Sequence, residues 1–332
     1  MTGVELTVVI PIRNEAASLV ELHREFTDTL TAWGRAYEII IVDDGSADGS
    51  FEILSRLQSD DPHLRVIRFR RNFGQTAAFA AGFAHARGPL IVTSDGDLQN
   101  DPRDIPAMVE MLQGGYDIVC GWRKDRKDAL LSRRLPSTMA NALISAVTGV
   151  RLHDYGCSLK VFRAEIVKDM KLYGEMHRFL PAIASEQTSS IGEMVVNHRA
   201  RKYGQSKYGI GRTVRVMLDL LTVKFLLSYS TRPLQIFGLM GGAMGLGGLA
   251  IIAWLASVRL MGILGLMPDQ SIGNRPLLLI GILLVFTGVQ LVTLGLLAEL
   301  QVRTYHESQN KPIYVIREIR QTVSNDHALL KH

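Results

Sequence analysis

The N-terminal part of the chain alternates between short apolar runs and longer stretches with helical periodicity. Runs rich in Val and Ile are typical of strands, and strands that alternate with helices favour a mainly parallel α/β sheet covered on both faces. We expect helices over about 15–33, 48–59 and 74–87 and from Pro102 onward. The expected strands are ELTVVIPI (5–12), YEIIIVDD (37–44), LRVIRF (64–69), PLIVTSD (89–95) and YDIVCGW (116–122).

The alternation weakens after Arg123. A helix over about 131–148, a short strand in SLKVF and a strand in GEMVVNHRA are expected to complete the domain, which we place at residues 1–208. Residues 209–232 mix Arg and Lys with Val, Leu and Phe at helical spacing. This composition is typical of an amphipathic helix that lies in a membrane interface.

Hydropathy is concentrated late in the chain. Leu234–Val258 and Leu277–Ala298 contain no charged residue, and a helix that crosses the bilayer core needs about 20 residues. We therefore expect two transmembrane helices within residues 233–302, followed by a C-terminal tail, 303–332. The alternative is a buried helix pair of a soluble protein, although such helices rarely stay uncharged over this length.

The charge distribution predicts the orientation of these spans. Basic residues flank them on the N-terminal side and in the tail, whereas the connecting loop carries only Arg259 and Arg275. By the positive-inside rule, both termini and the main domain face the cytoplasm, which indicates a multi-pass protein of the inner (cytoplasmic) membrane. Glycines of the first span, such as Gly241 and Gly245, have the small-xxx-small spacing that favours helix packing within or between protomers. We expect a homo-oligomer on this ground.

The 332 residues are enough for more than one domain, and the net charge of +5 is mildly basic. Eight Lys or Arg lie between Arg199 and Arg232 against one acid, Asp219. Such a cluster indicates phosphates or anionic lipid. No helix-turn-helix, finger or RNA-binding signature accompanies it, so nucleic acid is not an expected partner. Cys120 and Cys157 lack any metal-ligand spacing and are expected to be reduced thiols.

Carboxylates follow two of the expected strands directly. VDDGS (42–46) and SDGDLQ (94–99) bring Asp44, Asp95 and Asp97 to strand ends, each beside a glycine that lets the backbone turn. Ligands of parallel α/β sheets bind beyond the carboxyl ends of strands, and carboxylates this close repel one another unless a cation compensates them. Oxygen ligands of this kind favour Mg²⁺ or Mn²⁺ shared with substrate phosphates.

Acid-rich loops also arise as turns that cap the following helix. We favour that interpretation for Asp101, which precedes Pro102, and it stays an alternative for the other three carboxylates.

The ordered set VVIPIRNE, VDDGS and the D-x-D of SDGDLQ resembles the family 2 glycosyltransferases with the GT-A, Rossmann-like fold. The similarity continues through DYGCSLKVFR (154–163), RKYGQSKYG (201–209) and the two apolar spans, so it covers nearly the whole chain. Within the family it resembles the polyprenyl-phosphate glycosyltransferases, a branch that includes dolichyl-phosphate mannose synthases and bacterial undecaprenyl-phosphate enzymes. The QxxRW motif of processive synthases is missing, and two spans cannot build a polymer channel.

The resemblance implies roles for residues at matching positions. Those expected around the nucleotide sugar are Pro11, Arg13, Glu15, Val42, Asp44, Asp95 and Gly96, while Asp97 and Gln99 are the implied metal ligands. Those expected to hold acceptor or donor phosphates are Arg123, Arg133, Ser137, Arg201 and Lys207, and the implied catalytic residues are Asp97, Asp154 and Arg201. The alternatives are plain strand structure for Pro11 and Val42, and a solvated surface charge for Arg133. Arg13 stands where the family often has an aromatic residue.

The resemblance also implies the reaction, an inverting transfer of one sugar from a nucleotide sugar to a membrane polyprenyl phosphate. A UDP-sugar and undecaprenyl phosphate are favoured, because RNFGQTAAFAAGF and DYGCSLKVFR are nearer to the bacterial enzymes. One alternative is a GDP-mannose-dependent dolichyl- or polyprenyl-phosphate mannose synthase. Another is a catalytically silent membrane scaffold that partners a flippase or a downstream glycosyltransferase. The sequence does not name the sugar.

A phosphate acceptor changes what the protein has to supply. A phosphate monoester has its second pKa near ~6 and is mostly dianionic at pH 7, so it is a nucleophile without a general base. The protein then has to hold two anions close together and in line, with Arg123, Arg201 and Lys207 offsetting their repulsion. Asp154 is expected to orient a basic side chain or the sugar, and a turn or helix cap is the alternative.

Overall fold

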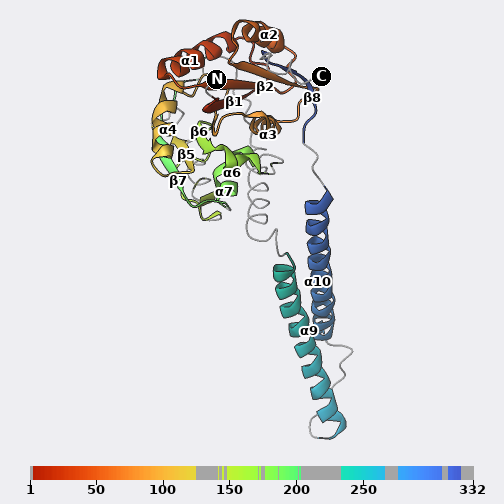
Figure 1. The fold of residues 1–332 in the computed structure, drawn as a ribbon. Coiled ribbons are helices and arrows are strands. Elements are labelled where there is room, and N and C mark those ends of the chain that lie inside the picture. Colours follow the sequence, from red (N-terminus) through yellow and green to blue (C-terminus); the bar gives the residue numbers. More distant parts are fainter. Residues whose placement is uncertain are drawn as a thin grey trace, which may run out of the picture. The chain divides into compact units, whose positions relative to one another are not determined.

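Eight strands of the described residues form one mixed sheet in the computed structural model, in the order β7-β5-β6-β4-β1-β2-β3-β8 (Figure 1). The expected α/β class is confirmed, because helices separate the first strands along the chain. The strands are β1 (Leu6–Ile12), β2 (Tyr37–Asp43), β3 (Leu64–Phe69), β4 (Leu90–Thr93), β5 (Ile118–Trp122), β6 (Lys160–Arg163), β7 (Ile191–Val195) and β8 (Ile316–Arg320). The structure describes residues 3–124, 141, 144–145, 148–170, 172, 176–185, 187–200, 202, 233–265, 276–308 and 313–322.

Strand directions decide which loops share an edge of the sheet. β1 pairs in parallel with β2 and β4, β2 pairs in parallel with β3, and β5 pairs in parallel with β7. β6 runs antiparallel to β4 and β5, and β8 runs antiparallel to β3. The carboxyl ends of all the strands except β6 and β8 therefore meet at one edge, which the amino ends of β6 and β8 also reach. We call this edge the carboxyl edge.

Helices cover both faces of the sheet, as strands with unbroken apolar runs require. On one face α1 (Leu19–Trp33), α2 (Ser50–Asp60) and α4 (Ile105–Gln113) share a hydrophobic cluster with β1, β2 and β3. On the other face α3 (Gln75–His85) packs through a row of alanines against β2 and β3. The buried faces keep the strands rigid, and the loops at the carboxyl edge are held by that frame.

Several helical elements differ from the sequence prediction. The first helix begins at Leu19 and not near residue 15. Before it, the amides of Asn14, Glu15 and Ala16 donate to side chains of residues 46–50, which lie in the loop after β2 and at the start of α2. The helix expected from Pro102 begins as a 3-10 turn, η1 (Pro102–Asp104). Short elements that the sequence analysis missed are α6 (Ala164–Lys168), η3 (Met176–Phe179) and α7 (Leu180–Ala184).

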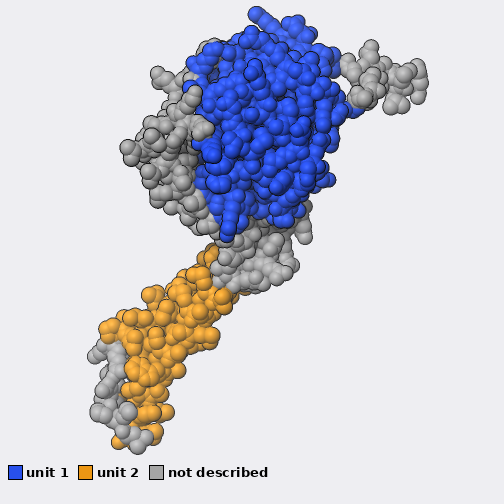
Figure 2. Space-filling view, turned by 90° about the vertical axis from the view of Figure 1, so that its left-hand side faces the viewer, with its two compact units in different colours: residues 1–223, 312–332 blue, residues 224–311 orange. Residues whose placement is uncertain are grey.

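The C-terminal strand β8 departs most from the expected order. Residues 303–332 were expected to form a separate tail, whereas β8 adds to the sheet beside β3. Tyr314 stacks on Phe69 with the ring centroids 5.2 Å apart, and Ile316 packs against the cluster under α3. Residues 312–332 therefore belong to one compact unit with residues 1–223, drawn in blue in Figure 2.

The second unit, residues 224–311, contains two long helices, α9 (Pro233–Ile263) and α10 (Pro276–Ser308). Their segments Phe237–Ile263 and Pro276–Leu297 are long and apolar enough to cross a membrane, judged by length and composition. Both expected spans fall within these helices. The interfacial helix expected at 209–232 lies outside the described residues.

Glycines allow α9 and α10 to approach each other closely. A Cβ added at Gly241 would lie 2.5 Å from the carbonyl oxygen of Gly288, and one added at Gly248 would lie 2.5 Å from that of Gly281. A Cβ at the neighbouring Gly242 would meet nothing within 4 Å. The spacing of the glycines allowed helix packing either within or between protomers. Part of the glycine pattern of the first span packs within the chain.

Candidate functional site

The candidate site lies at the carboxyl edge, where β1, β2, β4 and β5 end. β1 lies between β2 and β4 in the sheet. The chain passes from β1 to β2 on one side and later returns from β3 to β4 on the other side, so the strand order reverses at β1. Open α/β sheets bind ligands at such a point. Arg13, Asp44, Asp95 and Arg123 each follow the end of one of these strands within two residues. The fold thus brings together charged groups that are far apart along the chain.

The turn after β4, in SDGDLQ, has a constrained backbone. Leu98 is buried and has a φ of 63°, a region that residues with a side chain rarely adopt. A Cβ at Gly96 would lie 2.7 Å from Ile12 Cγ2, so glycine is needed where the turn crosses the end of β1. The amide of Gln99 donates to Asp97 Oδ1 at 3.2 Å. These constraints fix the main chain from which the carboxylates project.

Two carboxylates crowd this turn. Asp95 Oδ1 accepts a hydrogen bond from Gln75 Nε2 at 2.6 Å, and the Asp95 amide donates to Ser158 Oγ at 3.2 Å. Burial and then the nearby charge of Asp97 raise the pKa of the Asp95 carboxyl. Oxygen donors that repel one another are a donor set that a hard divalent cation fits.

The donor set at this turn is small. Within the described residues there is no group of three or more His, Cys, Asp or Glu side chains that could hold a metal ion. Sites for Mg²⁺ commonly use one or two carboxylates and complete their coordination with water and substrate phosphates. The carboxylates here fit that kind of shared site better than a cage built by protein alone.

Asp44 holds the loop in front of α3. Its carboxylate accepts the amide of Phe73 at 2.6 Å and the amide of Gly74 at 3.0 Å. Burial raises the pKa of the Asp44 carboxyl, although these two hydrogen bonds act in the opposite direction. The neighbouring Asp43 has a buried Oδ2 that accepts no hydrogen bond from the described residues and lies 3.7 Å from Arg68 Nε. The end of β2 therefore carries two buried carboxylates at the carboxyl edge.

The other residues expected around the nucleotide lie at the ends of β1 and β2. Pro11 and Val42 are buried and lie opposite each other in the pairing of β1 with β2. The Val42 side chain packs under α3, so its main chain is what remains to contact a ligand. Arg13 is exposed at the end of β1, and the amide of Glu15 donates to Ser50 Oγ at 3.1 Å.

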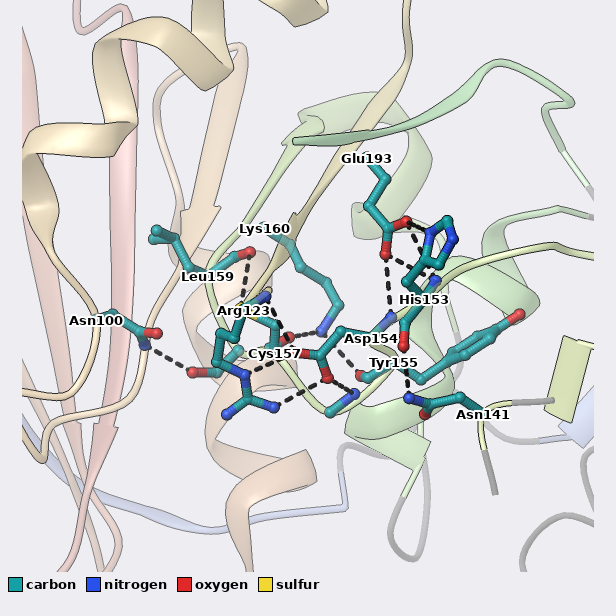
Figure 3. A network of polar contacts seen from close by, with 12 residues as sticks. Asn100, Arg123, Asn141, His153, Asp154, Tyr155, Cys157, Leu159, Lys160 and Glu193 are labelled. Carbon is teal, nitrogen blue, oxygen red and sulfur yellow. Dashed lines mark hydrogen bonds and ion pairs between the residues drawn. The ribbon is translucent and has the colours of Figure 1, made fainter. Parts of the chain in front are cut away.

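Arg123 and Asp154 form a buried, two-pronged ion pair (Figure 3). Arg123 Nε donates to Asp154 Oδ2 at 2.7 Å, and Nη2 donates to Oδ1 at 3.0 Å. The side chains are 14% and 5% exposed. Burial lowers the pKa of the Arg123 guanidinium, but the hydrogen bonds to Asp154 and the nearby acidic groups together raise it above its ordinary value, so the cation persists. Asp154 is therefore the ion-pair partner of a basic side chain in this structure.

The loop after β7 lies along the turn that carries the carboxylates. Arg199 donates its amide to the Gln99 carbonyl at 2.9 Å, and its guanidinium pairs with Glu25 at 2.7 Å and Asp101 at 2.8 Å. The Asp101 side chain also accepts the amide of Arg103, so the expected capping role of Asp101 is present. Arg199 thus fastens the loop, and it is engaged in ion pairs of the protein itself.

Four expected phosphate-binding residues lie outside the described residues, namely Arg133, Ser137, Arg201 and Lys207. Gln75, Ser158 and Asn100 were missed by the sequence analysis. Asn100 Nδ2 donates to Ser158 Oγ at 2.8 Å, and through Ser158 it supports Asp95. Gln75 and Ser158 lie within the stretches RNFGQTAAFAAGF and DYGCSLKVFR, but the sequence does not show their partners, since the interactions connect loops that lie far apart along the chain.

The two cysteines are buried and free. Burial raises the pKa of the Cys120 thiol to about 12 and raises that of Cys157 as well. Both thiols are therefore protonated at neutral pH, and neither is activated as a nucleophile.

Comparison with known proteins places these features in a family. The sequence model described as "Glycosyl transferase family 2" matches residues 7–171. The chain is 48% identical over 321 residues to a dodecaprenyl-phosphate galacturonate synthase of Rhizobium johnstonii, covering 96% of this chain and 93% of that protein. It is 39% identical over 321 residues to an undecaprenyl-phosphate 4-deoxy-4-formamido-L-arabinose transferase of Pseudomonas aeruginosa, covering 96% of this chain and 91% of that protein.

Solved structures share the fold at lower sequence identity. Mannosyl-3-phosphoglycerate synthase of Rubrobacter xylanophilus has a TM-score of 0.54 and 15% identity, covering 67% of this chain and 74% of that one. Glucosyl-3-phosphoglycerate synthase of Mycobacterium tuberculosis, solved in complex with Mn²⁺, UDP and glucosyl-3-phosphoglycerate, has a TM-score of 0.52 and 16% identity, with coverages of 67% and 78%. At this identity the likeness concerns the fold alone.

Proposed function

The chain belongs to glycosyl transferase family 2, and from that membership we propose that it transfers one sugar from a nucleotide sugar to a polyprenyl phosphate. Relatives at 48% and 39% identity, matched over nearly their whole length, carry names that state polyprenyl-phosphate sugar transfer. Undecaprenyl phosphate or a closely similar bacterial polyprenyl phosphate is the proposed acceptor. A UDP-sugar is the proposed donor, and GDP-mannose is the alternative.

The observation that carries the proposal is that acidic and basic groups lie together at the carboxyl edge of the sheet. Asp95 and Asp97 follow β4, while the Arg123 cation follows β5, and Arg123 contributes to the electrostatic environment of Asp95. A carboxylate turn suits the cation that accompanies a nucleoside diphosphate. A persistent guanidinium suits the phosphate of an acceptor or donor. Both groups are what a reaction between two anionic substrates requires.

A divalent cation, Mg²⁺ or Mn²⁺, is the proposed cofactor, with Asp97 and Gln99 as its protein ligands. Gln99 fits this role, because its side-chain nitrogen donates to the Arg199 carbonyl at 3.4 Å and leaves the amide oxygen as the group for a cation. When bound, the ion would neutralise charge on the diphosphate leaving group. Pro11, Arg13, Glu15, Val42, Asp44, Asp95 and Gly96 are the proposed surroundings of the nucleotide sugar.

The protein's own part in the reaction is to hold two anions in line. The acceptor phosphate needs no general base, because its dianion is already a nucleophile. Arg123, with Arg201 and Lys207, is proposed to offset the repulsion between acceptor and donor. Asp154 keeps Arg123 charged and oriented and does not take a proton. Displacement from one face then inverts the anomeric centre.

A lipid acceptor explains why the chain would need a membrane-anchoring second unit. We propose that α9 and α10 anchor the protein in the inner membrane as a multi-pass protein and that the sheet unit works on the cytoplasmic side. Two helices long and apolar enough to span support this proposal. A homo-oligomer, and association with a flippase or a downstream glycosyltransferase, are further expectations of the same proposal.

The test is a transfer assay with purified protein in detergent. Short-chain polyprenyl phosphate, Mn²⁺ and a panel of UDP- and GDP-sugars are supplied one donor at a time, and lipid-linked sugar is measured in the organic phase. We expect one donor class to give product and EDTA to abolish it. Absence of product across the whole panel would contradict the proposal and favour the membrane scaffold.

A further inference from the structure

Glu193, on β7, fastens the turn that presents Asp154 to Arg123. Its Oε1 accepts the main-chain amides of His153 at 2.9 Å and of Asp154 at 3.0 Å. Its Oε2 lies 2.6 Å from His153 Nδ1 (Figure 3). The Glu193 side chain is 13% exposed. One carboxylate thus takes up two consecutive amides and a ring nitrogen, an arrangement that a neutral or shorter side chain cannot reproduce.

The far side of the same turn is held by a buried lysine. Lys160 is 2% exposed, and its ammonium donates to the carbonyls of Tyr155, at 3.4 Å, and of Cys157. The Asp154 side chain closes the turn by accepting the amide of Gly156 at 3.1 Å. Residues 153–157 are therefore held from both ends by groups of opposite charge.

The turn and Arg123 are also tied through a ring contact. His153 stacks on Trp122 with the ring centroids 4.2 Å apart and an interplanar angle of 17°. Trp122 is the last residue of β5 and directly precedes Arg123. In the parallel pairing of β5 with β7, Glu193 lies opposite Cys120. Glu193 therefore connects to Arg123 by two routes, one through Asp154 and one through His153 and Trp122.

We propose that Glu193 is a positioning residue, which sets the orientation of Arg123 through the main chain of residues 153–154. The inference rests on the proposed function, in which Arg123 holds a substrate phosphate. Glu193 touches neither substrate in this account. Its effect arises because Arg123 can form its two-pronged pair only while Asp154 stays in place, and phosphate recognition by a guanidinium depends on that geometry.

The test compares Glu193→Ala and Glu193→Gln with a matched control, Asp61→Asn. Asp61 also accepts a main-chain amide and a histidine nitrogen, both from His63, but it precedes β3 at the opposite edge of the sheet. We expect Glu193→Ala to lower kcat/KM for the polyprenyl phosphate about tenfold with the donor KM unchanged. Glu193→Gln should restore part of the loss, because its amide oxygen can still accept an amide. Asp61→Asn should leave acceptor use unchanged.

A double-mutant cycle separates positioning from general stability. Arg123→Lys keeps the charge but cannot form the two-pronged pair. If Glu193 acts through Arg123, most of its effect should be absent once Arg123 is Lys. Adding Glu193→Ala to the Arg123→Lys variant should then lower kcat/KM for the polyprenyl phosphate by less than about twofold. Fully additive losses would overturn the inference, as would a Glu193→Ala variant whose acceptor use matches that of Asp61→Asn.

A spectroscopic measurement keeps this test independent of the proposed reaction. With Trp33 and Trp254 replaced by Phe, the remaining emission comes from Trp122, which the stacked His153 ring is expected to quench. Glu193→Ala should raise that emission, whereas Asp61→Asn should not. Unchanged emission would overturn the inference whether or not the wild type transfers sugar. A wild type that makes no lipid-linked sugar, with emission that does respond, would instead refute the proposed function.

Discussion

Replacing Asp154 with Asn should both destabilise the sheet unit and impair the use of the acceptor. The substitution keeps the volume but removes the charge that offsets Arg123, whose side chain is 14% exposed. It also places an amide NH₂ against a donor-only side chain. Breaking a buried ion pair by changing one partner costs about 3–5 kcal/mol. For a domain of this size the melting temperature should fall on the order of 10 °C.

The assay is thermal unfolding in detergent, measured beside turnover and its pH profile. The control is Asp117→Asn, which removes the ion pair of Asp117 with Arg163 at the other end of β5. In this pair Arg163 Nε lies 2.9 Å from Asp117 Oδ1, and the two side chains are 35% and 32% exposed. Exposed pairs contribute about 0–1 kcal/mol, so this control should melt within a few degrees of the wild type. Asp154→Asn should retain measurable turnover with an unshifted pH profile, because Asp154 takes no proton in the reaction.

Two results would refute this reasoning. If Asp154→Asn has the same melting temperature as the Asp117→Asn control and normal turnover, the ion pair with Arg123 neither stabilises the sheet unit nor orients Arg123 as described. If the variant is stable and binds metal and donor normally but shows no turnover at any pH, Asp154 acts as a general base, and the acceptor is not activated by its own charge.

Substitutions at the α9–α10 contact, at Gly96 and at Asp97 have distinct expected effects. Gly241→Val should overpack the contact between α9 and α10 and lower the stability of the helix pair by about 1–3 kcal/mol. Gly242→Val is the control and should be neutral. Equal thermal stability of the two variants in detergent would contradict the glycine contacts. Gly96→Ala should cost a similar amount, about 1–3 kcal/mol, and weaken donor binding in calorimetry, because its Cβ meets Ile12. Asp97→Asn should abolish turnover, and turnover that persists in EDTA would rule out the proposed metal site.

The sequence predicts the parts of the site that are local. The strands β2 and β4 are apolar runs that Asp residues follow closely, so Asp44 and Asp95 can be placed at strand ends without a structure. The pair of Arg123 with Asp154 joins residues 31 positions apart, and neither residue carries a signal that names its partner. Glu193 sits on an edge strand in which polar residues are common, so its role is visible only once β7 is aligned with β5.

The strand β8 was missed for a related reason. Its sequence IREIR alternates apolar and charged residues, as an edge strand with one covered face does. It reads as a charged tail because its partner β3 lies before both apolar helices in the sequence. The contact of Tyr314 with Phe69 shows which face is covered. Pairing over such a separation depends on the folded unit, so the alternating sequence of β8 does not show that β3 is its partner.

In the proposed reaction, the phosphate on a polyprenyl lipid receives the sugar. The most direct measurement supplies the purified protein with its donor and either polyprenyl phosphate or the matching unphosphorylated polyprenol, and identifies the lipid product by mass spectrometry. We expect a single sugar joined through the phosphate, with inverted anomeric configuration, and no product from the polyprenol. Equal transfer to the alcohol, or a product with retained configuration, would contradict it.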